Sequence, residues 1–170
     1  MHFFKSKKKN ILPLYNKIVH LTRENFFYKD FKLSDSLSNR IYLIFFYLSF
    51  ILITLKKKKS DKSHQQVIFD FFFKQIELTL RELGYGDIAV NKKMKGLIKL
   101  FYEILITCHN WKTLHINHKN DLFLRFFTNN SKSKILTSKL TNYFDEFSFY
   151  VEDISLNSLT KGVFNFSYKE

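Results

Sequence analysis

The stretch QQVIFDFFFKQIELTLREL, residues 65–83, decides the fold class because its charged side chains recur at helical spacing. Four charged residues follow one another at steps of four, three and four: Asp70, Lys74, Glu77 and Arg81. They form one narrow exposed stripe with two favourable pairs, Asp70–Lys74 and Glu77–Arg81. Almost all the remaining residues are apolar, which is typical of a helix inside a bundle. We therefore expect residues 65–83 to be the central helix of an all-α protein.

The composition favours the same fold class. Among 170 residues there are one proline and four glycines, whereas a β-sandwich or barrel needs turn signals roughly every 8–12 residues. Hydrophobic residues make up 45% of the chain, which argues against disorder. We expect a single-domain helical bundle of about five to seven helices. This domain covers residues 13–170 and ends in a short irregular C-terminal tail; residues 1–12 form a basic N-terminal tail.

Two helices are expected before the central one. Pro13 suits the first turn of an amphipathic helix that runs to about Phe27, and the SDS at 34–36 supplies caps for the next helix. That helix contains the uncharged run IYLIFFYLSFILITL, residues 41–55. Fifteen residues span roughly 22 Å, which is short of the ~30 Å hydrocarbon layer. We favour a buried core helix, with lipid contact or a membrane span as the alternatives, followed by a solvated loop at KKKKSDKSH.

Three of the four glycines lie in RELGYGDIAVNKKMKG, residues 81–96, where a phosphate-binding loop has to be considered. Such a loop follows a strand and opens a helix, whereas Gly84 follows a helix, and neither the full Gly-x-Gly-x-x-Gly nor a Gly-Lys-Ser/Thr is present. Gly84 is better placed as the left-handed residue that closes the helix at Leu83. We expect a connector at 85–90 and a new helix capped by Asn91, followed by helices at 121–127 and 136–151.

A metal site is the second chemical possibility. One short segment gathers four metal-ligating side chains: Cys108, His109, His115 and His118. Structural zinc sites usually show paired Cys or Cys/His spacings, which this segment lacks. We expect a buried thiol and solvated loop histidines. No triad or carboxylate pair is arranged in the chain either, so we expect no enzyme, no catalytic or metal-binding residue, no cofactor and no small-molecule substrate.

The formal charge of +13 has two explanations that the sequence leaves open. The 28 basic residues comprise 24 lysines and four arginines, in a chain rich in Asn and Phe, so drift toward AT-rich codons explains much of the charge. The other explanation is an anionic partner, such as a ribosome surface or an anionic membrane. Specific nucleic-acid binding is not expected, because such sites favour arginine and open aromatic surfaces. The single cysteine and the absence of a secretory signal predict a reducing, cytoplasmic location.

Two stretches resemble the ubiquinol–cytochrome c chaperone family, whose members assist assembly of the respiratory ubiquinol–cytochrome c reductase complex. They are LYNKIVHLTRENFFYKDFKLSDSLSNRIYLIFFYLSF and VIFDFFFKQIELTLRELGYGDIAVNKKMKGLIKLFYEIL, and the most specific part is LRELGYGDIAVNKKMK at 80–95. The resemblance covers 14–108 and reappears at Gly162-Val163-Phe164. The chain departs from the family pattern at four positions, with Asn91 for proline, Tyr47 for histidine, and Ile53 and Thr54 for basic residues.

The resemblance implies a non-enzymatic, all-α chaperone that binds newly made cytochrome b or its assembly intermediate, as mitochondrial relatives do near the ribosomal exit tunnel. It also implies a bacterial protein, cytoplasmic and peripheral to the inner face of the membrane. The alternatives are a basic helical module for nucleic acid or ribosomes and a small membrane-associated protein. If a partner binds near the most specific motif, the candidate contact residues are Tyr85, Asp87, Lys92, Lys93, Lys95 and Lys99.

Overall fold

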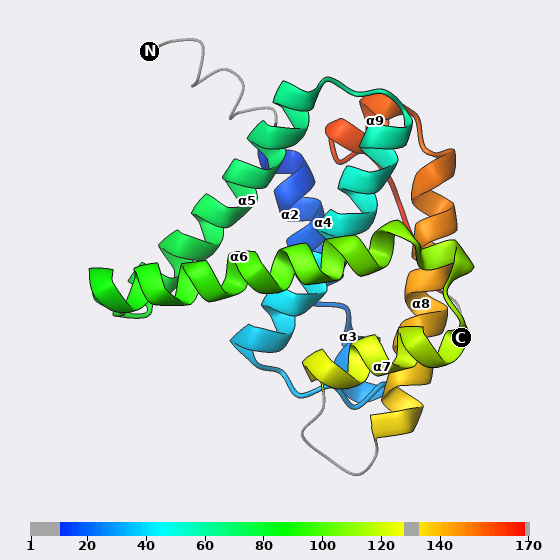
Figure 1. Cartoon of the computed structure of the whole chain (residues 1–170), viewed down its shortest axis with the longest axis horizontal. Helices are drawn as coiled ribbons and strands as arrows, with labels where there is room; N and C mark the ends of the chain where they lie inside the picture. Colours follow the sequence, from blue (N-terminus) through cyan, green and yellow to red (C-terminus); the bar gives the residue numbers. More distant parts are fainter. Residues whose placement is uncertain (1–10, 128–132, 169–170) are drawn as a thin grey trace.

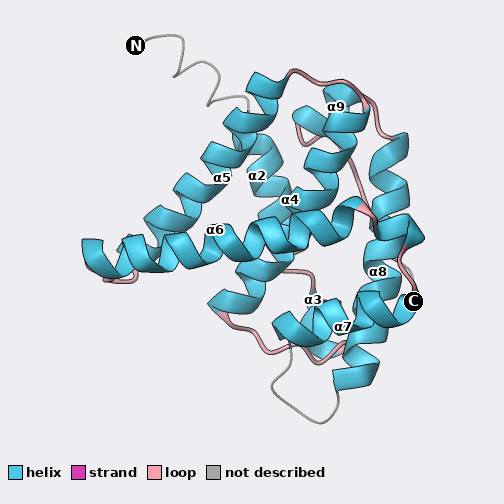
Figure 2. Ribbon diagram, viewed as in Figure 1, coloured by secondary structure: helices cyan, strands magenta, loops and turns pink. Residues whose placement is uncertain are grey.

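The computed structural model describes residues 11–127 and 133–168, which places most of the expected basic tail at 1–12 outside the described residues. Within those ranges the chain is helical and contains no strand (Figure 2), which confirms the all-α prediction. The six helices of ten residues or more are α2 (Leu12–Leu21), α4 (Leu37–Lys57), α5 (Lys62–Glu82), α6 (Asp87–His109), α7 (Ile116–Phe127) and α8 (Ser133–Asp153). Shorter ones are α3 (Asn25–Lys29), the 3₁₀ turn η1 (Trp111–Thr113) and α9 (Leu156–Thr160).

The centre of the bundle is α4 rather than α5, so the expectation for 65–83 was wrong in this respect. α4 packs against α2, α5, α6, α7 and α8, whereas α5 contacts mainly α4 and α6 and lies at one side (Figure 1). Within 41–55 every side chain is buried or half-buried. A helix that is apolar on all sides shows no periodicity. Its sequence therefore does not indicate whether it or a neighbouring helix lies at the centre of the bundle.

The ends of α4 follow from local chemistry. The Ser36 hydroxyl accepts a hydrogen bond from the Asn39 backbone N–H at 3.2 Å, which confirms a cap in the SDS segment. At the other end Lys59 has a positive φ of 55° and the Ser60 N–H bonds to the Leu55 carbonyl at 2.9 Å. The expected loop at KKKKSDKSH is therefore shorter than predicted: only residues 58–61 separate α4 from α5.

α4 is also the one helix in the described residues that is long and apolar enough to cross a bilayer. Of its most apolar window, 78% is buried inside the protein, as expected for the core helix of a helical bundle. Ile53 and Thr54, which stand where the resemblance implies basic residues, are buried as well. This agrees with the core-helix interpretation of 41–55.

The first helix is shorter than expected. α2 ends at Leu21 rather than near Phe27, and the chain turns through residues 22–24 before α3. The Thr22 hydroxyl bonds to the Val19 carbonyl at 2.8 Å, and the Tyr28 hydroxyl donates to the Thr22 carbonyl. A side chain that bonds to the preceding turn competes with the continuing helix.

The C-terminal segment is irregular, as expected, yet it belongs to the core. Gly162 has a φ of +66°, and a Cβ there would lie 2.7 Å from the Cα of Leu14. This contact places the tail against the first turn of α2. From there Phe164 is buried, and the ring of Phe166 lies 5.3 Å from that of Tyr143 and 5.2 Å from that of Phe147 in α8.

Candidate partner-binding surface

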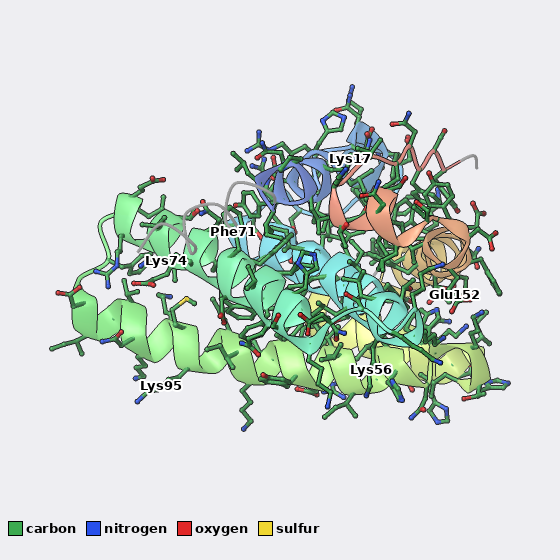
Figure 3. All side chains as sticks on the ribbon, turned by 90° about the horizontal axis from the view of Figure 1, so that it is seen from above. Lys17, Lys56, Phe71, Lys74, Lys95 and Glu152 are labelled. Atoms are coloured by element: carbon green, nitrogen blue, oxygen red, sulfur yellow. The ribbon has the colours of Figure 1, made fainter. Side chains whose placement is uncertain are left out.

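The end of α5 and the start of α6 form a helical hairpin that projects from the bundle (Figures 1 and 3). Gly84 has a φ of +86°, and its N–H bonds to the Arg81 carbonyl at 2.9 Å. The Tyr85 N–H bonds to the Leu80 carbonyl at 3.2 Å. These two bonds form a Schellman motif, which confirms the predicted role of Gly84.

The next helix begins earlier than expected. α6 starts at Asp87 with Gly86 as its N-cap, not at Asn91, so the 85–90 connector was wrong. The Val90 N–H bonds to the Gly86 carbonyl at 2.9 Å, and the Asp87 carboxylate lies in the first turn, where the helix dipole favours negative charge. Only residues 83–86 therefore separate α5 from α6, and Leu80 and Val90 are buried between the helices outside the main core.

Three of the predicted contact residues make contacts around this turn. The Arg81 guanidinium donates hydrogen bonds to the Asp87 carboxylate and, at 2.9 Å, to Glu77. The Nζ of Lys93 lies 4.6 Å from the centre of the Tyr85 ring. Tyr85 and Lys93 are thus in contact with each other, whereas Asp87 pairs with Arg81.

The other three predicted lysines lie on α6 as well. Lys92, Lys95 and Lys99 are exposed at helical spacing, and Figure 3 shows Lys95 pointing away from α5. Ile88 falls on the same stripe, because positions 88, 92, 95 and 99 repeat every three or four residues. The stripe therefore starts with an apolar side chain and continues with cations.

The sequence indicated Tyr85 as a contact residue but not the other apolar side chains of this surface. Ile88 is 88% exposed, Leu83 is 58% exposed, and the Tyr85 ring is exposed between them. We call Leu83, Tyr85 and Ile88 the hairpin tip. The available signal was three large apolar side chains in a turn segment, where neither helix can bury them. An exposed apolar cluster rimmed by charge is typical of a protein interaction site.

Two acidic side chains of the hairpin, Glu77 and Asp87, are paired with cations. Lys74 bonds to Glu77 at 3.0 Å rather than to Asp70, which contradicts the expected Asp70–Lys74 pair; Asp70 instead accepts from Gln66 at 2.8 Å. The expected Glu77–Arg81 pair is confirmed at 2.9 Å. Hydrogen bonds from Lys74 and Arg81 lower the pKa of Glu77. The carboxylates at 77 and 87 are thus engaged with neighbouring cations, whereas the lysines of the α6 stripe are exposed and form no ion pair among the described residues.

The cysteine and histidine segment was predicted to hold a buried thiol beside solvated histidines. Cys108 is buried in the core, and burial raises the pKa of its thiol well above the ordinary value. His109 ends α6 and His118 lies in α7, so the expected loop is mostly helical. No group of three metal-ligating side chains converges within residues 11–127 and 133–168.

Part of the chain, the hairpin included, is similar to a known protein family. The family described as Ubiquinol-cytochrome C chaperone matches residues 29–110, a segment that includes α4, α5, the turn and α6. Over these residues the chain is similar to the ubiquinol-cytochrome C chaperone family. By its description, this is a family of chaperones.

The fold of the whole chain is also known. The crystal structure of the Cbp3 homolog from Brucella abortus superposes with a TM-score of 0.77 at 24% sequence identity, over 98% of this chain and 92% of that chain. α2, α7 and α8, which lie outside the ubiquinol-cytochrome C chaperone segment, therefore follow the same fold. No curated protein matches the chain significantly.

Proposed function

We propose that this chain is a non-enzymatic chaperone that binds newly made cytochrome b during assembly of the ubiquinol–cytochrome c reductase complex. The family match at 29–110 carries the general part of this proposal, because it includes the hairpin that projects from the bundle. The client itself is a proposal from the resemblance. It agrees with a surface that offers apolar side chains to an apolar client.

The hairpin tip is the contact surface we propose. Burying large apolar side chains such as Leu83 and Ile88 against a partner releases about 1.5–3 kcal/mol each. An unassembled membrane subunit exposes the apolar surface that such a contact needs. The lysine stripe beside the tip, Lys92, Lys95 and Lys99, adds attraction for anionic groups, and we include Tyr85, Asp87 and Lys93 in the same contact surface.

The location we propose is the cytoplasmic side of the bacterial inner membrane, where membrane subunits are inserted. A net charge of +13 favours residence near anionic lipid, since each basic residue near such a surface contributes about 1 kcal/mol. The mostly buried α4 makes a peripheral location more consistent with the fold than a transmembrane one.

A complementation experiment tests this function. The gene is deleted, and the level of assembled reductase complex is measured with the wild-type chain, with Ile88→Glu and with Ile135→Glu supplied in trans. Ile135 lies on α8 and is 68% exposed, so it controls for placing a carboxylate on exposed apolar surface. We expect the deletion and Ile88→Glu to lower the complex, and Ile135→Glu to restore it.

A deletion strain with a normal level of the complex would contradict the proposal. The alternative function, a basic module for ribosomes or nucleic acid, predicts a different result. In that case binding disappears with added salt and shows no preference for cytochrome b.

A further inference from the structure

A groove lies at the opposite end of α5 from the hairpin tip. The 58–61 connection joins α4 to α5, and α6 packs against both helices (Figure 1). The groove lined by these three helices has a volume of about 730 Å³. This value lies within the roughly 300–1,000 Å³ that is typical of ligand pockets.

One end of the groove is apolar. Tyr102 and Ile106 on α6 are 47% and 68% exposed, and Phe69 and Leu105 are half-buried beside them. The Phe69 ring lies 5.5 Å from the buried ring of Phe101, so the floor is packed rather than loose. Large apolar side chains are therefore left open to solvent in a concave site.

The other end of the groove is cationic. Lys56, Lys59 and Lys62 lie at the end of α4, in the connection and at the start of α5, and all three are exposed. No aspartate or glutamate lines the groove. Within the described ranges none of these three lysines forms an ion pair; the neighbouring Lys57 pairs with Glu152 at 2.8 Å instead. Three unneutralised cations thus converge on one end.

The separation of charge from apolar surface identifies the occupant. An amphipathic helix carries its charges along its whole length, whereas this groove has cations at one end and apolar side chains at the other. We infer that the groove binds an anionic phospholipid of a bilayer, with the phosphate at Lys56, Lys59 and Lys62. Part of one acyl chain lies against Phe69, Tyr102 and Ile106.

Two weak interactions together account for the proposed lipid binding. Clustered lysines are attracted to anionic lipid, and an apolar contact adds binding that salt does not screen. Either signal alone gives only marginal membrane attachment, whereas the two together give stable attachment. The inference does not depend on the chaperone function, because no residue of the hairpin tip lines the groove.

Vesicle binding by the purified full-length chain tests the proposed contact between the lysines and the lipid phosphate. Binding to phosphatidylcholine vesicles, with and without phosphatidylglycerol, is compared for the triple variants K56Q/K59Q/K62Q and K92Q/K95Q/K99Q. Both variants remove three exposed lysines, so both lower the net charge equally. We expect the groove variant to lose roughly tenfold or more in affinity for the anionic vesicles and the hairpin variant to lose much less. Equal losses would overturn the inference, because they would mean non-specific attraction.

Insertion of the acyl chain is tested at Ile106. An environment-sensitive dye is attached to Ile106→Cys and, as the control of equal exposure, to Ile135→Cys. We expect a blue shift with anionic vesicles at 106 only, and no shift at 106 with inorganic phosphate. No shift at 106, or the same shift at both positions, would overturn the inference. So would a groove variant that lost chaperone activity in cells yet kept vesicle binding, because the occupant would then be a protein.

Discussion

Tyr47 in α4 and Tyr143 in α8 hydrogen-bond to each other through their hydroxyl groups in the interior of the bundle. Both side chains are almost fully buried, and the Tyr143 ring also lies 4.9 Å from the ring of Phe27 and 5.1 Å from that of Tyr168. The central helix, α8, the α3 segment and the C-terminal tail therefore meet around this pair. Tyr47 stands where the resemblance implies histidine, and here its polar group is satisfied from within the fold.

Removal of one hydroxyl from this pair should destabilise the protein. Tyr47→Phe leaves the buried Tyr143 hydroxyl without its partner, which costs about 1–3 kcal/mol in the free energy of unfolding. The double variant Y47F/Y143F should cost less than the sum of the single variants, because no buried hydroxyl is left unpaired. Urea denaturation of the four proteins measures the coupling, and strictly additive losses would contradict the contact.

The same pair predicts how stability depends on pH. Burial is the main cause that raises the pKa values of Tyr47 and Tyr143 above the ordinary value. In the unfolded chain the two phenols ionise near pH 10, while the folded protein keeps them protonated. Ionisation of these two groups should therefore leave the free energy of unfolding unchanged below about pH 10. Above about pH 10 it should lower the free energy of unfolding as the pH rises. The fall should be shallower in Y47F/Y143F, and an identical pH profile would contradict burial of the pair.

Replacing three of the glycines by alanine should change the stability of the protein by different amounts. Gly162→Ala combines a positive φ with a Cβ 2.7 Å from the backbone of Leu14, so it should cost roughly 2–4 kcal/mol. Gly84→Ala meets open space and retains only the conformational strain of φ +86°, about 1–2 kcal/mol. Gly96→Ala, exposed in α6 with nothing within 4 Å, should stabilise by about 0.5–1 kcal/mol. Thermal unfolding of the three variants checks the order, and a harmless Gly162→Ala would contradict the docking of the tail.

Asp145 should be the most sensitive carboxylate of the bundle. It accepts hydrogen bonds from the Trp111 indole N–H at 2.6 Å and from Lys119 at 2.7 Å, and Lys119 is largely buried. Asp145→Ala leaves two donors without a partner and should cost about 1–3 kcal/mol. The exposed Asp121→Ala is the control and should stay within about 0.5 kcal/mol. Equal stability of the two variants in urea would contradict this assignment.

Local patterns in the sequence predicted most of the helices. Pro13, the SDS segment and Gly84 act on their own turns, so they indicated starts and stops close to the observed ones. Which helix lies at the centre of the bundle was harder to predict, because the uniformly apolar segment 41–55 has no polar face that would mark an exposed side. The length of the first helix was wrong because Thr22 and Tyr28 meet only after the chain has folded back.

The position of the candidate surface was predictable from the sequence, but its apolar character was not. The motif at 80–95 located the hairpin, and its lysines and Tyr85 are exposed as expected. Leu83 and Ile88 were missed, since an apolar residue at a turn looks like core until the turn is seen to project from the bundle. The groove between α4, α5 and α6 joins residues more than forty positions apart, a contact that no local pattern contains.

The central claim is that the hairpin tip contacts newly made cytochrome b, and in-cell photo-crosslinking tests it most directly. A photoreactive amino acid is placed at Ile88 and, as the control, at Ile135, and the crosslinked products are identified by mass spectrometry. The account predicts a cytochrome b adduct from position 88 and none from position 135. No cytochrome b from position 88, or equal amounts from both positions, would contradict it.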